Sequence, residues 1–277
     1  MKPAPFDYVR ASSVDEAVKL IASGEGDVMP IAGGQSLVPL LALRMTTPER
    51  LVDIGRIAAL RQVSESTSHV TIGAGVTHAD IEDGRVADPA NGLMRRIAAG
   101  IAYRAVRNQG TIGGSIALAD PAADWPACLI ALQAKARIAG PNGERSLLIE
   151  DLIDGIYSTR LERGELIVAF EIPRLAASAR TGVAKVARKT GAFAMSLVIA
   201  VHDGASTATR VVLGGAGSRP VCLAQASELL RGKAALEASL REAVAHDLAA
   251  IDRELDGYAR RLHTATVLRA IAEARPQ

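Results

Sequence analysis

Two glycine-rich segments of similar composition most constrain what this chain can fold into. The first is residues 31–37, Ile-Ala-Gly-Gly-Gln-Ser-Leu, and the second is residues 107–115, Arg-Asn-Gln-Gly-Thr-Ile-Gly-Gly-Ser. A Gly-Gly step can turn with positive φ and has no Cβ to block a ligand. Consecutive backbone N–H groups in such a turn form a concave anion site. Each turn taken alone is more often an ordinary tight turn, but the pair predicts one phosphate-bearing ligand held from two sides.

Composition limits the class of protein. The chain has 277 residues, of which 49% are hydrophobic and 22% charged, with a formal net charge of +2. That is enough for two globular domains. The small net charge implies no polyanionic partner, and 3% aromatic residues are too few for stacking single-stranded nucleic acid. We therefore expect no nucleic-acid partner.

The cysteines and the chain termini indicate a reduced, cytoplasmic protein. Cys128 and Cys222 are the two cysteines and form no C-x-x-C pair, which excludes a disulfide framework and a cysteine-ligated iron–sulfur or zinc site within the chain. The N-terminus has no apolar signal-peptide region. The longest apolar stretch, residues 192–201, is too short to span a membrane. The histidines are not spaced as metal ligands are, and we predict surface positions or local hydrogen bonds for them. They are His69, His78, His202, His246 and His263.

Local patterns predict an α+β chain. Ser13 and Glu16 form a capping box for a helix through Ile21. Ser36 is expected to cap a helix through Leu43, after a strand at 28–32. Further strands are expected at 51–54, 70–74 and 166–172, with a hairpin at 135–149 around Asn142-Gly143. Further helices are expected from 77, over 94–101 and from 120 to 132.

A shift in composition after Pro173 predicts a domain boundary. We expect an N-terminal domain over residues 1–175, with a break near 57, and a C-terminal domain over residues 176–277. The second domain is predicted to hold a three-stranded sheet, with strands at 183–186, 196–201 and 211–214, followed by helices from Ala224 onward, broken at Gly232 and Gly257. The irregular alternation of strands and helices favours α+β over a parallel α/β fold.

The chemistry of single residues leaves alternatives open. Neither glycine segment matches a P-loop or a Rossmann fingerprint, and neither Ser36 nor Ser115 has a nearby base. Asp120 and Asp124 could form an acid–base pair, or Asp120 could cap a helix. A basic cluster could contact a ligand or form a solvated edge: Lys185, Arg188 and Lys189. The residues by themselves predict a soluble α+β protein that binds a dinucleotide.

Several segments resemble the FAD-binding medium subunit of the molybdenum hydroxylases, the carbon monoxide dehydrogenase and xanthine dehydrogenase family. Residues 32–39 resemble its first FAD loop and residues 106–115 its second. Later segments fit in the right order, namely 119–124, 164–173, 185–194 and 219–221. The resemblance covers essentially the whole chain. Cys222 departs from the family, which often has Arg there, but it lies outside the expected flavin site.

The resemblance implies an FAD-binding fold of the vanillyl-alcohol oxidase and p-cresol methylhydroxylase type, followed by a smaller α+β C-terminal domain. It implies non-covalent FAD in the groove between them. Asp124 and Lys185 would hydrogen-bond the flavin, Ile167 would pack on it and Phe193 would cover its ring. The implied cofactor-binding residues are Ala32, Gly33, Gly34, Gln35, Ser36, Leu37, Ile101, Thr111, Ile112, Gly113, Gly114, Ser115, Asp124, Ile167, Lys185 and Phe193.

The resemblance also implies an oxidoreductase subunit without catalytic residues or a metal of its own. Electrons would arrive from a [2Fe–2S] partner and leave FAD for an external acceptor. The partners would be a small iron–sulfur subunit and a large subunit with the molybdopterin cofactor, in a heterotrimer that is doubled into a dimer of trimers. The alternatives are a stand-alone FAD-dependent oxidase or reductase, and a non-catalytic FAD-binding partner protein.

Overall fold

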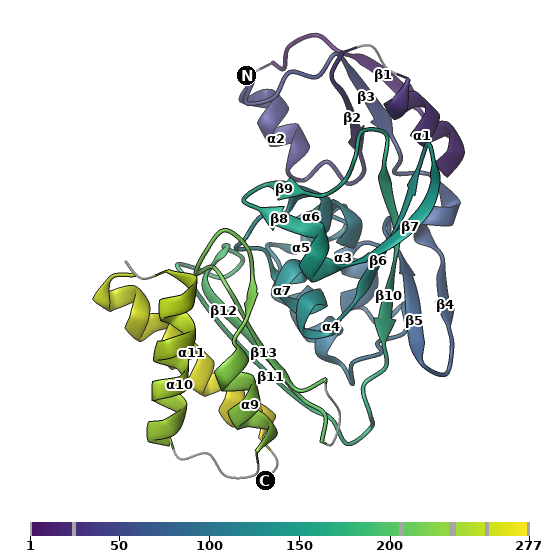
Figure 1. Cartoon of the computed structure of the whole chain (residues 1–277). Helices are drawn as coiled ribbons and strands as arrows, with labels where there is room; N and C mark the ends of the chain where they lie inside the picture. The colour runs from purple at the N-terminus through teal and green to yellow at the C-terminus, as the bar shows by residue number, and fades with distance from the viewer. Residues whose placement is uncertain (1, 24–25, 205–207, 233–236, 253–254, 276–277) are drawn as a thin grey trace.

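The computed structural model describes residues 2–23, 26–204, 208–232, 237–252 and 255–275, and it has an α+β fold with three main sheets (Figure 1). The N-terminal sheet is parallel, in the order β1 (Asp7–Arg10), β3 (Arg50–Asp53) and β2 (Val28–Ile31). Helix α1 (Val14–Ala22) packs on it, and α2 (Leu37–Ala42) follows the first glycine segment.

The N-terminal caps are only partly as predicted. The Ser13 side chain accepts a hydrogen bond from the backbone N–H of Glu16, but the Glu16 carboxylate accepts from the N–H of Ser12 rather than Ser13. Ser36 stands at the N-cap of α2 but makes no side-chain cap hydrogen bond, so the predicted capping role is wrong. Its hydroxyl therefore remains available to a ligand.

The middle sheet has five antiparallel strands, in the order β4 (Val63–Glu65), β5 (His69–Gly73), β10 (Leu166–Pro173), β6 (Lys135–Gly140) and β7 (Gly143–Leu148). The predicted hairpin is β6–β7, and it turns at Gly143. The 3-10 helix η1 (Ala58–Arg61) precedes this sheet. The helices of this region are α3 (His78–Glu82), α4 (Leu93–Ala99), α5 (Arg104–Arg107), α6 (Ile112–Leu118), α7 (Asp124–Ala131) and α8 (Ile149–Leu152), and a small hairpin pairs β8 (Ile153–Gly155) with β9 (Ser158–Thr159).

The C-terminal sheet has four antiparallel strands rather than the three expected. Its order is β11 (Arg180–Ala187), β12 (Ala194–His202), β13 (Arg210–Gly214) and β14 (Val221–Cys222). The extra strand has two residues, too few for a sequence pattern. The helices that follow are α9 (Ala224–Arg231), α10 (Glu237–Ile251) and α11 (Gly257–Ala274).

Helix α7 joins the two regions of the chain. All eight of its residues are buried, and it packs against β12 and β13, whereas α11 packs against β11 and β12. The C-terminal sheet therefore has a partner from the middle region as well as its own helices (Figure 1). The predicted division at residues 175 and 176, and the break near 57, stay predictions.

Candidate functional site

The first glycine segment has an unusual run of unpaired backbone donors. Between β2 and α2 the chain turns at Gly34, which has a φ of +69°. Among the described residues, the N–H groups of residues 33 to 37 have no hydrogen-bond acceptor, although the Gln35 amide donates to the carbonyl of Gly33 at 3.0 Å. Adjacent N–H groups of this kind form an anion-binding concavity, so this segment has the geometry that the sequence predicts.

The second glycine segment differs from that prediction because its Gly113-Gly114 pair lies in a helix. Thr111 is the N-cap of α6, and its Oγ1 accepts from the N–H of Gly114 at 3.0 Å. The N–H of Ile112 donates to Val76 and that of Gly113 to Ala74, at 3.1 and 2.9 Å. The N–H of Ser115 donates to the Thr111 carbonyl. These donors are used within the protein, so a second concave turn of free N–H groups is not formed.

The two segments lie in direct contact. A Cβ at Gly33 would stand 1.9 Å from the carbonyl oxygen of Gln109, so no side chain fits there. A Cβ at Gly113 would stand 2.6 Å from the Ala74 carbonyl oxygen. Gly114 is exposed, and a Cβ there would meet only Thr111 Oγ1, at 3.0 Å. The site therefore combines the free donors of the first segment with an exposed, side-chain-free surface at the start of α6.

A buried histidine supports the second segment from below. The backbone N–H of His78 donates to the Gly110 carbonyl at 2.9 Å, and its Nδ1 accepts from Trp125 Nε1 at 3.0 Å. Burial lowers the pKa of His78 to about 4, with a further contribution from Arg107. The ring is thus neutral at pH 7, with Nδ1 free to accept. The sequence analysis did not single out Trp125. The signal that could have found it is that it is the one tryptophan of the chain.

A buried ion pair connects the middle region with the C-terminal sheet. Lys185 Nζ on β11 lies 2.8 and 3.0 Å from the two carboxylate oxygens of Asp124, and 3.2 Å from the Gly100 carbonyl. The Asp124 side chain is 7% exposed and that of Lys185 is 19% exposed. Burial raises the pKa of Asp124, and Lys185 opposes that rise. The structure thus joins two predicted site residues from distant parts of the sequence.

Neither reading of Asp120 holds. Its Oδ1 accepts from the N–H of Ala122 at 2.8 Å and its Oδ2 from the Tyr157 hydroxyl at 3.2 Å. Asp124 instead binds Lys185, so the two carboxylates have separate partners and do not form an acid–base pair. Helix α7 begins at Asp124 with Ala123 as its N-cap, so Asp120 does not cap it.

The other predicted residues fall into two groups. Ile112 and Ile167 are in the main core, 0% and 3% exposed, so their side chains support the site from beneath and offer a ligand almost no surface. Ile101 is half-buried, and its carbonyl accepts from Arg107 Nη1 at 2.9 Å. Phe193 is 60% exposed, as a ring that covers a ligand would be before binding. The remaining residues of the first segment are half-buried or exposed: Ala32, Gln35, Ser36 and Leu37.

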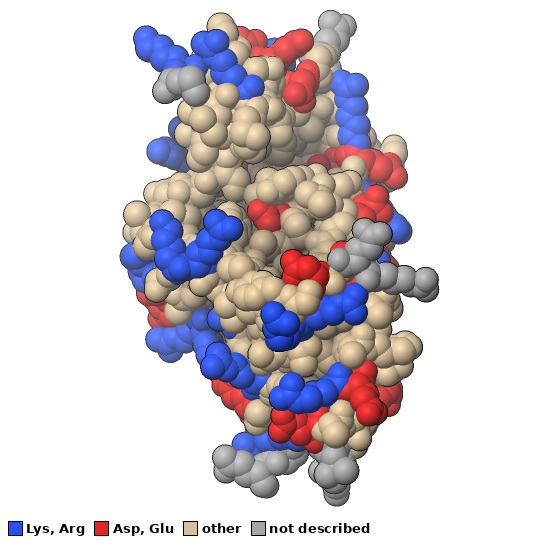
Figure 2. Space-filling model, turned by 90° about the vertical axis from the view of Figure 1, so that its left-hand side faces the viewer, with Lys and Arg blue, Asp and Glu red and all other residues tan. Residues whose placement is uncertain are grey.

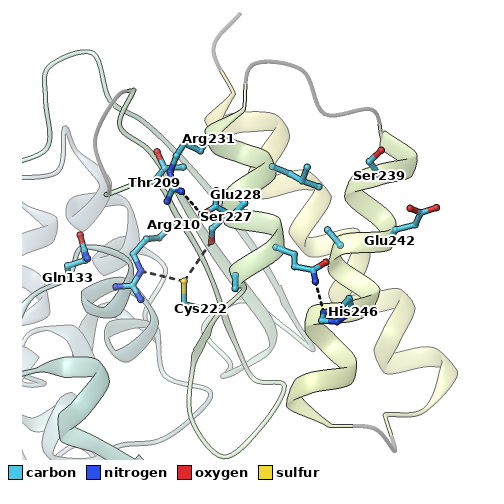
Figure 3. A pocket seen from close by; sticks show the side chains of 14 residues that line it. Gln133, Thr209, Arg210, Cys222, Ser227, Glu228, Arg231, Ser239, Glu242 and His246 are labelled. Carbon is cyan, nitrogen blue, oxygen red and sulfur yellow. Dashed lines mark hydrogen bonds and ion pairs between the residues drawn. The ribbon is translucent and has the colours of Figure 1, made fainter.

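Two surfaces of the molecule differ in character. Figure 2 views the side on which α2 and the β8–β9 hairpin lie in Figure 1, and there the surface is hollowed beneath the upper lobe with mostly uncharged walls. A pocket of about 890 Å³ in the C-terminal region has both polar and apolar lining residues (Figure 3). Its Arg210 has protein partners, since Arg210 binds Glu150 at 2.6 Å and donates to Cys222 Sγ at 3.4 Å.

The fold and the free donors of the first segment define a protein that binds a phosphate-bearing cofactor. Residues 4–175 match the family described as the FAD binding domain in molybdopterin dehydrogenase. The chain is 37% identical over 234 residues to the alpha subunit of the 6-hydroxypseudooxynicotine dehydrogenase complex of Paenarthrobacter nicotinovorans, covering 83% of this chain and 79% of the relative. It is 34% identical to the carbon monoxide dehydrogenase medium chain of Afipia carboxidovorans, covering 88% and 86%.

Similarity to solved structures supports the same family. A chain of carbon monoxide dehydrogenase from Hydrogenophaga pseudoflava superposes with a TM-score of 0.92 at 34% identity, covering 99% of this chain and 98% of that chain. The chain therefore belongs to the family of FAD-binding medium subunits of molybdenum hydroxylases, and it is an oxidoreductase subunit. The predicted fold of the p-cresol methylhydroxylase type is confirmed. The relatives are dehydrogenase subunits, which does not favour the stand-alone oxidase or the non-catalytic partner.

The described residues include neither a membrane-spanning helix nor a group of metal ligands. No helix in the described ranges is long and apolar enough to cross a membrane. No group of three or more His, Cys, Asp or Glu side chains in those ranges is arranged to hold a metal ion.

Proposed function

We propose that this chain holds one non-covalent FAD between its two glycine segments and passes electrons from a [2Fe–2S] partner to an external acceptor. The observation that carries the proposal is the run of free N–H groups at residues 33 to 37, placed against the second segment. Five adjacent N–H groups without an acceptor suit a pyrophosphate without a lysine. The electron-transfer part of the proposal is supported by the relatives, which are subunits of dehydrogenases.

The residues present fit this cofactor. The N–H groups of 33 to 37 and the Ser36 hydroxyl would bind the pyrophosphate, while the exposed Gly114 would let it approach α6 and Ser115 would add a hydroxyl. The Lys185–Asp124 pair would lie beside the flavin as a charged group of fixed orientation. Phe193 would cover the flavin ring. Bound FAD supplies the redox chemistry, and the protein positions and tunes it.

The iron–sulfur and molybdenum centres belong to partners in this proposal. A [2Fe–2S] cluster needs four ligands, and the chain has two cysteines, Cys128 buried in the core and Cys222 in the C-terminal sheet. We propose a small iron–sulfur subunit and a large molybdenum subunit, in a heterotrimer doubled into a dimer of trimers. Both cysteines are free, which suits a reducing, cytoplasmic compartment.

Electron transfer between purified subunits tests this function. The small iron–sulfur subunit is reduced with dithionite, freed of excess reductant, and mixed anaerobically with the FAD-loaded chain. We expect the flavin absorbance band to bleach, whereas the same mixture with the oxidised small subunit stays unchanged. The chain without partners should not oxidise organic substrates at ordinary enzyme rates of roughly 1–10³ s⁻¹. Oxidation at such rates, or no bleaching, would contradict the proposal.

A further inference from the structure

A groove between α10 and α11 has a composition that the flavin site does not explain. It has a volume of about 800 Å³ and belongs to the C-terminal helices, away from both glycine segments. Five arginines line it, namely Arg241, Arg260, Arg261, Arg269 and Arg275, against one acidic residue, Glu237. Figure 2 shows basic side chains over the part of this face that the C-terminal helices form.

Two of the five arginines have no ion pair with a described residue. Arg241 pairs with Glu237 at 2.7 Å, on the same helix. Arg261 and Arg269 are exposed and make no ion pair with any described residue. Two exposed guanidinium groups of this kind on one groove favour an anionic occupant.

Apolar side chains also line part of the groove. Leu240 from α10 and Ile271 from α11 lie beneath it, at 3% and 0% exposure, and offer an occupant almost no surface. Leu268 is half-buried, and Ala265 and Ala272 are exposed on the same lining. These accessible apolar side chains beside the arginines suit an occupant that has both apolar anchors and carboxylates, as an amphipathic protein segment has.

The arginines of α11 are not needed to pack that helix. Its buried side chains, among them Val267, Ala270 and Ala274, face the C-terminal sheet. The approach is close, because a Cβ at Gly182 on β11 would stand 1.9 Å from the Ala270 carbonyl oxygen. Glu273 on that same helix is already paired with Arg96. Arg261 and Arg269 therefore remain for an outside partner.

We propose that this groove, the arginine groove, binds an acidic segment with apolar anchors from another subunit of the complex. The proposal rests on the proposed function only in taking the partner to be a subunit. A lipid surface fits less well because the exposed apolar residues of the lining, Ala265 and Ala272, have short side chains. Nucleic acid fits less well because no aromatic side chain lines the groove.

Charge reversal tests the arginine groove. The chain carrying Arg261→Glu and Arg269→Glu is mixed with its partner subunits, and assembly is measured by size-exclusion chromatography with light scattering. We expect at least tenfold weaker assembly, and weaker assembly of the wild type at high salt because salt screens exposed charges. The matched control, Lys19→Glu with Lys135→Glu, makes the same change of charge on exposed lysines of α1 and β6 and should assemble normally.

FAD content separates this proposal from the proposed function. Both double variants should keep the FAD of the wild type, because neither changes a residue near the glycine segments. If the wild type binds no FAD, the proposed function fails, but the assembly measurement still decides the groove. Undiminished assembly of the Arg261→Glu, Arg269→Glu chain would overturn the proposal.

A cross-link identifies the occupant. A photoreactive benzoylphenylalanine in place of the exposed Ala265 should capture a partner-subunit peptide with more Asp and Glu than Lys and Arg and with a large apolar residue. A basic peptide, a peptide of a second copy of this chain, or no cross-link in an assembled complex would contradict the proposal. Sedimentation of the wild-type chain, but not the double variant, with phosphatidylserine vesicles would assign the groove to lipid and overturn it too.

Discussion

At the scale of single residues, the four glycines of the two Gly-Gly pairs have different roles. Gly33 and Gly113 allow backbone contacts inside the protein, with Gln109 and Ala74. Gly34 has the positive φ of a left-handed turn, which costs most other residues about 1 kcal/mol or more. Gly114 alone of the four stands exposed with nearly open space in front of it. Only at Gly114 does a substitution test the ligand surface without first disturbing the fold.

We predict that Gly114→Val weakens FAD binding at least tenfold, about 1.4 kcal/mol. The valine would occupy the surface on which the pyrophosphate approaches α6, while its Cβ meets only Thr111 Oγ1. Titration of flavin fluorescence measures the affinity. The control is Gly232→Val, because Gly232 has extended backbone angles and only ordinary contacts for a Cβ. Equal affinity in Gly114→Val and wild type would remove α6 from the site.

His78 gives a prediction about pH. Its pKa is about 4 in the folded chain, against 6.5 for an unperturbed side chain. The unfolded chain therefore binds a proton below about pH 6.5 that the folded chain binds only below about pH 4. Stability from this group is complete above about pH 6.5, and about 3 kcal/mol of it is lost as the pH falls to about 4.

The variant His78→Asn isolates that effect, because its amide oxygen can accept from Trp125 in place of Nδ1 but does not titrate. Urea unfolding at about pH 7 and about pH 4.5 should show a smaller loss of stability in the variant than in the wild type. Carboxylates titrate equally in both proteins and cancel in the comparison. The same loss in both proteins would mean that His78 is not buried in its neutral form.

At the scale of helices and strands, an ion pair links α7 to β11 where the two regions meet. Lys185 reaches from β11 to Asp124 at the first position of α7. Removing one member of a buried ion pair leaves a charge without compensation, which costs about 3–5 kcal/mol. We discount this to about 3 kcal/mol because the Lys185 side chain is 19% exposed.

We therefore predict that Lys185→Met lowers the free energy of unfolding by about 3 kcal/mol and that adding Asp124→Asn recovers part of the loss. Lys189→Met, at an exposed position of the same cluster, is the control and should change stability little. Chemical denaturation of the four proteins gives the comparison. A Lys185→Met chain as stable as wild type would show that the pair does not hold the two regions together.

The sequence predicted elements whose signal is local. The strands, the β6–β7 hairpin and the cap of α1 follow from periodicity, Asn142-Gly143 and Ser13, all of which act over a few residues. The helix at 112–118 was missed because two adjacent glycines oppose a helix locally. It forms since Val76 and Ala74 accept the N–H groups of its first residues. Such long-range partners leave no mark in a local pattern.

For the candidate site as well, the sequence predicted the local features and missed the long-range contacts. The free donors at 33 to 37 follow from Gly33-Gly34, but the use of the second segment's donors inside the protein does not. The family resemblance placed Lys185 and Asp124 at the site, yet their ion pair spans distant parts of the sequence and needed the structure. The binding roles of all these residues stay predictions until the variants above are measured.

At the scale of the whole molecule, the chain has two surfaces for which we propose separate binding functions. The surface at the glycine segments would hold FAD, and the arginine groove would hold a partner segment. The two surfaces belong to different parts of the chain, because the glycine segments precede residue 116 and the arginine groove lies between α10 and α11. We therefore expect FAD binding and subunit assembly to fail separately in the variants above.

The flavin content of the purified chain tests the central claim most directly. After loading with FAD and desalting, the protein should show flavin absorbance without iron–sulfur absorbance, at one FAD per chain. Heat or acid should release that FAD into the supernatant, because neither glycine segment has a Cys or His to attach it. A colourless chain that binds no FAD would contradict the account, and flavin that stays with the precipitated chain would contradict its non-covalent site.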